Sequence, residues 1–490
     1  MKITELTGSA STPSSLDNVD ITGITADSRQ VKPGYLFAAL RGTQQDGRAF
    51  AAQAIANGAS VILTDNAAAL PIDEATRRSL RIIEDQNPAR RLAQLAARFH
   101  GRQPRIIAAV TGTNGKTSVA HFTRELWMAL GMPAASLGTL GLVSPAGRRG
   151  GALTTPDPVS LHHDLAALAA DGVEHVAIEA SSHGLAQFRL DGLDVTAAAF
   201  TNLTRDHLDY HGDMAGYRAA KQRLFVDLLR PGGAAVLNAD SPEYPGLAVL
   251  CQDRGYRVIS YGSAPEAELR ILARSPRPFG QDLALDIGGT KHKIELPLVG
   301  AFQAMNALAA LGLVIATGSP NEAAIAALAR LTGVPGRLQY VGHTRAGAPV
   351  FVDYAHTPDA LATVLTALRP HTDQRLTVVF GAGGDRDRGK RPQMGEIAAA
   401  LADRIYVTDD NPRSEDAASI RRAILDAVPG ATEIGNRREA IAAAIDALAT
   451  GDVLVIAGKG HETGQIVGGT ILPFDDAVVA REVLQAAGGT

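Results

Sequence analysis

Short apolar runs alternate with polar, glycine-rich loops along most of this sequence. The repeated order is a β-branched run, then a glycine- or aspartate-rich loop, then an alanine- and leucine-rich stretch typical of a helix. Strands that alternate with helices in this way predict α/β domains whose sheets are mostly parallel. We therefore expect an α/β fold, and we find no internal repeat or low-complexity tract.

Four apolar runs in the middle of the chain predict the strands of one sheet: 105–110, 175–178, 195–200 and 234–237. The first three lead directly into loops dense in polar residues. Ligands of open α/β sheets bind beyond the carboxyl ends of the strands, so these loops are expected to meet in one crevice. Three further runs predict a second crevice of the same kind: 376–380, 404–408 and 453–457.

The length of 490 residues predicts more than one domain, because single hydrophobic cores stop growing at about 250–300 residues. Breaks in the helical pattern at Gly318–Pro320 and Gly333–Gly336 place one boundary near residue 338. We expect domains at 1–100, 101–337 and 338–490. The first contains the polar segments 27–29 and 43–47, and it is interpreted as a binding domain.

Composition excludes several classes of function. Hydrophobic residues make up 46% and charged residues 20%, with a net charge of −4, which indicates neither disorder nor a surface for nucleic acid. The opening residues lack the pattern of a signal peptide, and the apolar stretch 307–316 is shorter than the ~20 residues of a membrane span. The single cysteine, Cys251, fits a reducing cytosol. We expect a cytoplasmic protein without membrane or nucleic-acid partners.

The segment 111–118, Thr-Gly-Thr-Asn-Gly-Lys-Thr-Ser, follows the strand that ends at Val110 and precedes a helix expected to begin near Val119. Backbone N–H groups at a helix N-terminus bind anions, Lys116 adds a positive charge, and a hydroxyl can bind Mg²⁺. Strict Walker spacing requires glycine where Val110 stands, so this is a shortened variant. A glycine-rich turn is the alternative, but the strand and helix context favours a triphosphate-binding loop.

Other polar residues are ambiguous by themselves. Glu179 ends the next strand, where a carboxylate could bind the metal of a nucleotide, or could simply face solvent. His207 and His211 follow the third strand, but loop histidines are usually only solvated. Lys221 lies in the predicted helical segment 217–229, where an exposed helix lysine is the simpler interpretation.

Four motifs together resemble the Mur ligases of peptidoglycan synthesis and occur in the order of that family: 111–117, 179–185, 201–207 and 211–214. The resemblance covers essentially the whole chain. It implies an N-terminal domain for a UDP-sugar, a central P-loop ATPase-like domain and a Rossmann-like C-terminal domain. It also implies an ATP-dependent amide-bond ligase that uses ATP, two Mg²⁺ ions, and CO₂ in the form of a lysine carbamate.

The resemblance assigns roles to residues at matching positions. Lys116, Glu179, His207 and Lys221 would be catalytic, and the metal ligands would be Thr117, Glu179, His207 and Lys221, the last modified to a carbamate. Carbamylation turns a cation of pKa ~10.4 into an anion, which reverses the simpler interpretation of Lys221. The implied ATP-binding residues are Gly112, Thr113, Asn114, Gly115, Lys116, Thr117, Ser118, Asn306, Arg337 and Asp353.

The substrate residues are implied in the same way. UDP-N-acetylmuramoyl-L-alanyl-D-glutamate would contact Ser28, Thr43, Gln44, Gln45, Thr154, Thr155, Ser181, Gln187 and Arg189. The run Asp-Asn-Pro-Arg at 410–413 resembles the diaminopimelate-adding branch of the family. Meso-diaminopimelate differs from lysine by a second carboxylate, which an arginine can pair with through two hydrogen bonds. Its implied contacts are Arg386, Asp410, Asn411, Pro412, Arg413, Gly458 and Glu462.

Three alternatives remain. A lysine-adding relative is disfavoured by Arg413, which lysine would leave unpaired. A folylpolyglutamate- or cyanophycin-type ligase leaves the 410–413 run and the N-terminal block unexplained. A nucleotide-dependent switch that makes no bond would not need Glu179, His207 and Lys221 together. We expect the protein to be a monomer.

Overall fold

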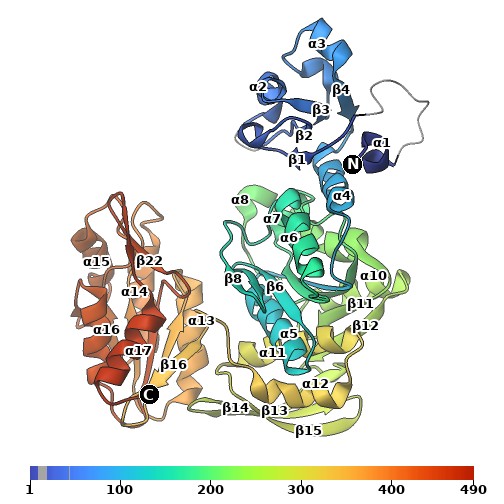
Figure 1. Cartoon of the computed structure of the whole chain (residues 1–490). Coiled ribbons are helices and arrows are strands. Elements are labelled where there is room, and N and C mark those ends of the chain that lie inside the picture. Colours follow the sequence, from blue (N-terminus) through green and yellow to red (C-terminus); the bar gives the residue numbers. More distant parts are fainter. Residues whose placement is uncertain (9–18, 43–44) are drawn as a thin grey trace. The chain divides into compact units, whose positions relative to one another are not determined.

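The computed structural model describes residues 1–8, 19–42 and 45–490, so the predicted contacts Thr43 and Gln44 lie outside the described residues. The chain forms two compact units. One comprises residues 1–259 and 316–318, and the other comprises 260–315 and 319–490. The main sheet of each unit is mostly parallel and is combined with helices, which confirms the predicted α/β class (Figure 1). Among the described helices, none is both long and apolar enough to cross a membrane.

The first unit begins with a parallel sheet of order β1-β2-β3-β4. Helix α4 starts where the Asn87 side chain accepts a hydrogen bond from the Arg90 N–H, with Pro88 in its first turn. Its Leu92 and Leu95 belong to a core shared with the sheet. The bounds are α1 Ile3–Thr7, β1 Gly23–Thr25, η2 Ser28–Gln30, β2 Tyr35–Ala38, η3 Gly47–Phe50, α2 Ala51–Ala56, β3 Ala59–Thr64, η4 Ala67–Ala69, α3 Glu74–Ser79, β4 Arg81–Glu84 and α4 Pro88–His100.

The second sheet of this unit has the strand order β12-β11-β10-β5-β9-β6-β7-β8. The four predicted central strands are confirmed, and β5, β9 and β10 are parallel neighbours as the crevice requires. The elements are β5 Ile106–Thr111, α5 Lys116–Ala129, β6 Ala134–Gly138, β7 Gly141–Ser144, β8 Gly147–Arg149, α6 Pro158–Ala170, β9 His175–Glu179, α7 Ser182–Ala186, β10 Val195–Phe200, α8 Leu208–His211, α9 Met214–Arg223, the π-helical turn η5 Leu224–Leu228, β11 Leu229–Asn238, α10 Tyr244–Asp253 and β12 Arg257–Gly262.

Two local boundaries differ from prediction. Helix α5 begins at Lys116 rather than near Val119, because Gly115 with φ 89° already forms its N-cap. The segment predicted as one helix, 217–229, is the end of α9, a π-helical turn and the first residue of β11. Apolar side chains at Leu224, Phe225 and Leu228 are buried in the core, so their periodicity reflected packing and not a continuous α-helix.

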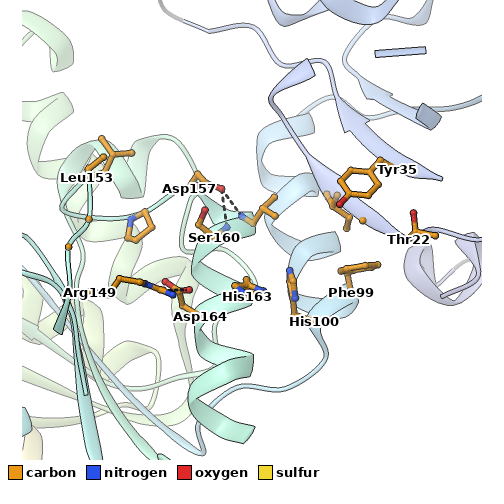
Figure 2. Close-up of a pocket in the computed structure, with 17 residues that line it drawn as sticks. Thr22, Tyr35, Phe99, His100, Arg149, Leu153, Asp157, Ser160, His163 and Asp164 are labelled. Atoms are coloured by element: carbon orange, nitrogen blue, oxygen red, sulfur yellow. Dashed lines mark hydrogen bonds and ion pairs between the residues drawn. The ribbon is translucent and has the colours of Figure 1, made fainter. Parts of the chain in front are cut away.

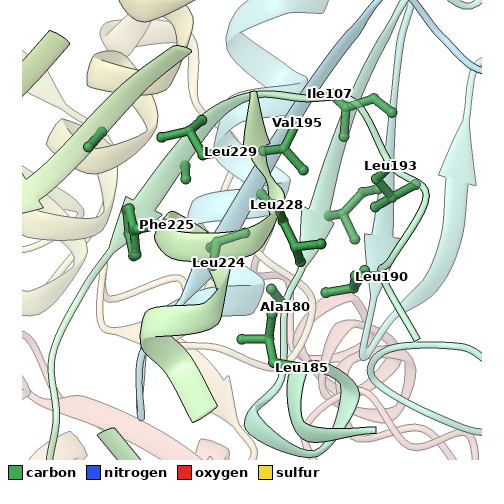
Figure 3. Close-up of a cluster of buried hydrophobic side chains, with 14 of the residues drawn as sticks. Ile107, Ala180, Leu185, Leu190, Leu193, Val195, Leu224, Phe225, Leu228 and Leu229 are labelled. Carbon is green, nitrogen blue, oxygen red and sulfur yellow. The ribbon is translucent and has the colours of Figure 1, made fainter. Parts of the chain in front are cut away.

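The core of this part of the unit lies between the sheet and its covering helices (Figure 3). Ile107, Val195 and Leu229 from three neighbouring strands belong to one cluster with Leu224 and Phe225. None of these five side chains is more than 4% exposed. This packing fixes the positions of the strand ends relative to one another, and these ends carry the polar loops.

Leu229→Ala should destabilise the protein by about 2–5 kcal/mol, because it removes buried methyl groups and leaves a cavity. Leu229 is only 4% exposed. The midpoint of urea unfolding of this unit would measure the loss. Leu153→Ala is the matched control, since Leu153 is 46% exposed and its change should stay within about 0.5 kcal/mol. Equal shifts for the two variants would contradict the packing described.

The second unit contains an antiparallel meander and a six-stranded sheet of order β16-β17-β21-β18-β19-β20. Separate cores cover the two faces of that sheet, so it is doubly wound. The predicted strands 376–380 and 453–457 have those bounds, and 404–408 ends one residue early. The elements are β13 Leu269–Arg277, β14 Gly280–Ile287, β15 Thr290–Leu296, α11 Ala301–Ala316, α12 Asn321–Ala327, η6 Leu328–Arg330, β16 Gln339–His343, β17 Pro349–Asp353, α13 Pro358–Leu368, η7 Arg369–His371, β18 Leu376–Phe380, α14 Lys390–Leu401, β19 Arg404–Val407, α15 Ala417–Leu425, β20 Thr432–Glu433, α16 Arg437–Asp446, β21 Val453–Ala457, β22 Gly464–Val467, β23 Thr470–Pro473 and α17 Asp476–Ala486.

Candidate active site

The predicted phosphate loop joins β5 to α5 and is held by the loop that follows β10. The Thr113 N–H donates to the Asn202 carbonyl at 2.8 Å, and the Asn114 N–H donates to the Asn202 side-chain oxygen at 3.0 Å. A side chain at Gly112, where φ is 146°, would overlap the Thr201 hydroxyl. The two loops therefore meet at one sheet edge, as predicted, and glycine is required for their close approach.

Two lysines share a single carbonyl in this loop. Lys116 Nζ donates to the Gly112 oxygen at 2.9 Å, and Lys221 Nζ donates to the same oxygen at 2.6 Å. Lys221 is only 1% exposed, and its Nζ lies 4.3 Å from the centre of the Tyr217 ring. Burial, with the nearby charge of Lys116, lowers the pKa of Lys221 to about 6. Lys221 is thus a buried amine of the site and not an exposed helix lysine.

Glu179 faces the first turn of α5 from the end of β9. Its carboxylate accepts hydrogen bonds from the Thr117 hydroxyl at 3.0 Å and the Thr139 N–H at 2.7 Å. Glu179 is 2% exposed, so it does not face solvent. A side chain at Gly138 would overlap this carboxylate. A hydroxyl and a carboxylate in contact are the hard oxygen donors that Mg²⁺ prefers, so these residues fit that ion.

Within the described residues, no group of three or more histidine, cysteine, aspartate or glutamate side chains is arranged to hold a metal. The predicted metal ligands Thr117, Glu179, His207 and Lys221 do not form a group of this kind. They combine a hydroxyl, one carboxylate, one histidine and a lysine that becomes a ligand only when carbamylated.

His207 stands at the start of α8 with a left-handed backbone, φ 51°. Its side chain is 48% exposed, and its ring lies 4.8 Å from the ring of His183 and 6.3 Å from that of Tyr217. Because Tyr217 also packs against Lys221, the predicted metal ligands His207 and Lys221 share this ring as a neighbour. His183, which sequence reasoning did not single out, is half-buried, and burial followed by the charge of His207 lowers its pKa.

The residues predicted to bind the UDP-muramoyl dipeptide in this part of the unit form one hydrogen-bonded cluster. The buried Thr155 hydroxyl donates to the Glu179 carbonyl at 2.7 Å and accepts from the Ser181 N–H at 3.0 Å. Arg189 donates to the Thr155 carbonyl at 2.7 Å and to the Gln187 side chain at 3.0 Å. The cluster is thus connected to the backbone of the predicted metal ligand Glu179.

Other predicted substrate contacts are less concentrated. The Thr154 hydroxyl pairs with that of Thr139 at 3.1 Å. Ser28 is buried, and its hydroxyl donates to the Gln53 side chain at 3.0 Å, whereas Gln45 is exposed. A cavity of about 590 Å³ lies beside Tyr35 and Asp157 (Figure 2), and none of the predicted site residues that the structure describes lines it.

Three residues predicted to hold adenine, phosphate and ribose lie in the second unit. The Asn306 amide donates to the Gln303 side chain at 3.0 Å, and Gln303 donates to the Arg337 carbonyl at 3.0 Å. The Asp353 carboxylate accepts from the Leu338 N–H at 2.7 Å. Burial raises the pKa of Asp353 to about 6. The structure therefore links Asn306 to Arg337 through Gln303, and places Asp353 against the residue after Arg337.

The predicted diaminopimelate contacts also gather, beyond the carboxyl ends of β18, β19 and β21. The Asn411 amide donates to Glu462 Oε2 at 2.9 Å, and Arg413 Nη1 donates to the Gly384 carbonyl at 2.8 Å. Gly458, with φ 117°, lies so close to the carboxylate of Asp410 that a Cβ there would be 2.6 Å from Oδ2. This second cluster matches the second crevice predicted. In the same loops Arg386 is exposed and Pro412 is buried.

Sequence reasoning missed two cations beneath these loops. Lys459 and Arg437 are both buried, with side chains 0% exposed. Arg437 forms a buried pair with Asp476 at 2.7 Å and donates to the carbonyls of Asp409 and Ala457, which precede the two loops. Lys459 lies between two predicted contacts, Gly458 and Glu462, and this position in the sequence was the available sign that it belongs to the site.

Comparisons with known proteins give a consistent answer. Models described as Mur ligase family, catalytic domain, Mur ligase middle domain, and Mur ligase, glutamate ligase domain match residues 20–100, 110–314 and 336–460. The UDP-N-acetylmuramoyl-L-alanyl-D-glutamate--2,6-diaminopimelate ligase of Caulobacter vibrioides is 54% identical over 480 residues, which is 96% of each chain. The enzyme of that name from Bradyrhizobium diazoefficiens is 51% identical over 97% of each chain.

Solved structures agree. A structure of a ligase of the same name has a TM-score of 0.77 at 33% identity and covers 100% of both chains. A MurF ligase of Thermotoga maritima in complex with ADP shares the fold, with a TM-score of 0.60 at 18% identity over 97% of this chain and 98% of the other. The three matched segments fit the three-domain architecture of these enzymes. The chain belongs to the Mur ligase family.

Proposed function

We propose that this protein is an ATP- and Mg²⁺-dependent ligase that joins meso-diaminopimelate to UDP-N-acetylmuramoyl-L-alanyl-D-glutamate in the cytoplasm, as a step in peptidoglycan precursor synthesis. One observation carries the proposal: the phosphate loop with Lys116 and Thr117 lies directly against the Glu179 carboxylate and the buried amine of Lys221. The relatives at about 50% identity, which bear the name of this activity, support it. The domains are proposed at 1–100, 101–337 and 338–490.

In the proposed reaction, a D-glutamate carboxylate oxygen attacks the γ-phosphorus of ATP, and ADP leaves. The amine of diaminopimelate then attacks the acyl phosphate carbon, phosphate leaves, and the nitrogen loses a proton. Lys116 and the loop N–H groups would bind the phosphates and offset their charge. Thr117, Glu179, His207 and carbamylated Lys221 would hold Mg²⁺, which offsets charge during phosphoryl transfer.

The carbamate is proposed on the geometry of the two lysines. Two ammonium groups on the Gly112 carbonyl would repel each other in a buried site, so one is favoured as the neutral amine. A neutral amine is the form that adds to CO₂, and the carbamate would turn this repulsion into an attraction toward Lys116. The proposal therefore explains why a lysine is buried beside the phosphate loop.

The amino-acid specificity is proposed to lie in the second unit. Arg413 would pair with the carboxylate that lysine lacks, and Glu462 would take the ammonium group beside it. A site that buries a charged partner rejects analogues that leave it unpaired, by more than an apolar pocket can. Release of phosphate by the purified protein with the UDP-muramoyl dipeptide and ATP tests the proposal. It should require meso-diaminopimelate, and release independent of any amino acid would refute the ligase function.

Thr155→Val should raise the KM for the UDP-muramoyl dipeptide about tenfold, because it removes the hydroxyl that bonds the Glu179 carbonyl and the Ser181 N–H, a loss of about 1–3 kcal/mol. Steady-state kinetics with ATP and diaminopimelate saturating would measure it. Thr123→Val is the control, since this buried hydroxyl donates to the Val119 carbonyl within α5. An unchanged KM for the dipeptide would remove Thr155 from the proposed binding site.

A further inference from the structure

A buried ammonium lies under the loop that carries Asp410 to Arg413. The side chain of Lys459 is 0% exposed, and its Nζ contacts Asn411 Oδ1 at 3.0 Å, Glu462 Oε2 at 3.1 Å and the Gly464 carbonyl at 2.6 Å. An ammonium group has three protons, so these three acceptors use all of them. A fully paired buried charge holds its partners in place, because breaking any of these contacts would leave part of the charge buried and unpaired, at a large cost in free energy.

The first consequence concerns the orientation of Glu462. Among the described residues, the hydrogen bonds to its carboxylate come from Lys459 and Asn411, and both go to Oε2. The Glu462 side chain is 34% exposed. Oε2 therefore already accepts hydrogen bonds from the protein. Oε1 can accept one from a group that arrives from solvent.

The second consequence concerns Arg413, which the same network reaches through Asn411. Asn411 Oδ1 accepts the Ile466 N–H at 2.9 Å as well as Lys459, which attaches strand β22 to the loop. That strand then holds the Arg413 backbone: the Arg413 N–H donates to the Ile466 carbonyl at 3.0 Å, and the Gly468 N–H donates to the Arg413 carbonyl at 2.7 Å.

Arg413 needs such support because its backbone is left-handed, with φ 52°. A residue other than glycine in this region is strained by about 1–3 kcal/mol and persists only where its surroundings enforce it. The β22 contacts supply that enforcement, and β22 is itself attached to Asn411. The direction of the Arg413 side chain thus depends on contacts that begin at Lys459.

We propose that Lys459 is a positioning residue for the incoming diamino acid, an inference that rests on the proposed function. It would touch no substrate. It would hold Glu462 for the ligand ammonium and, through Asn411 and β22, Arg413 for the second carboxylate. Recognition of a ligand with charges at both ends requires its two partners at a fixed separation, to within about 0.5 Å. Lys459 is the group common to both.

The test replaces Lys459 with methionine, which has a similar length and no charge. Lys459→Met should raise the KM for meso-diaminopimelate about 10–100-fold, the factor expected for losing one charge-assisted hydrogen-bond network. The KM values for ATP and the UDP-muramoyl dipeptide should stay within about twofold, since a positioning effect is confined to the amino-acid site. The preference for diaminopimelate over lysine should fall as well. Lys291→Met, at an exposed lysine of the same unit, is the matched control and should change none of these.

The outcomes are distinguishable. A selective rise for diaminopimelate supports the inference, whereas unchanged constants, or a proportional loss for all three substrates with a lower melting temperature, overturns it as a merely structural role. If Lys459→Met does not fold, Lys459→Gln, which keeps two of the three N–H donors, should give a smaller but equally selective rise of about threefold or more. Failure of the wild-type protein to release phosphate with diaminopimelate would instead refute the proposed function.

Discussion

Lys221→Ala should lower the ligase rate by a factor of about 10³ or more, because it removes a proposed metal ligand beside the transferring phosphoryl group. The side chain is 1% exposed and bonded to the Gly112 carbonyl, and no other described lysine except Lys116 donates to that oxygen. Phosphate release at saturating substrates would measure the rate. ATP binding, followed separately, should fall far less than the rate does.

Chemical rescue separates the carbamate from a simple structural role. Formate or acetate can occupy the space that Lys221→Ala opens and supply the missing carboxylate, so either should restore part of the activity. Lys32→Ala, at an exposed lysine of the same unit, is the control and should behave as the parent protein. An intact rate for Lys221→Ala would show that the carbamate assignment is wrong.

Arg413→Asn should lower kcat/KM for meso-diaminopimelate about 100–1000-fold, which corresponds to losing a charge-assisted bidentate pair worth about 3–4 kcal/mol. Asparagine is chosen because it tolerates the left-handed backbone at this position, where φ is 52°. The loss then reports on the guanidinium and not on backbone strain. Activity with lysine, which has no second carboxylate, should change much less.

Arg413→Lys tests geometry against charge. It keeps the cation but loses the planar fork, so a loss of about tenfold is expected for diaminopimelate. Arg438→Ala is the control, at an arginine of α16 that is 52% exposed and paired with Glu482. An equal fall for diaminopimelate and lysine in Arg413→Asn would contradict the role of Arg413 in choosing the amino acid.

Seven strands of the two largest sheets could be predicted because they are short apolar runs bounded by loops of a different composition. Runs such as 195–200 and 453–457 have the predicted bounds. The convergence of Thr113 with Asn202, and of Asn411 with Glu462, followed from the rule that parallel strands present their carboxyl ends at one edge. Periodicity failed at 224–228, where a π-helical turn buries the same apolar side chains that a helix would.

Individual roles were harder to predict than positions. Composition and periodicity alone gave Lys221 the interpretation of an exposed lysine, and only the resemblance to the Mur ligases placed it in the site. Its burial and the shared Gly112 carbonyl are tertiary facts that no local pattern contains. Lys459 and Arg437 were not predicted for the same reason. The partner of Lys459, Asn411, lies 48 residues away in the chain, and the partner of Arg437, Asp476, lies 39 residues away.

The most direct test of the proposed function is a competition between two amino acids. The purified protein would receive ATP, Mg²⁺ and UDP-N-acetylmuramoyl-L-alanyl-D-glutamate with equal concentrations of meso-diaminopimelate and L-lysine, and mass spectrometry would identify the product. We predict the diaminopimelate adduct, formed together with one ADP and one phosphate per molecule. A lysine adduct as the main product, or phosphate released without any adduct, would contradict the proposed function.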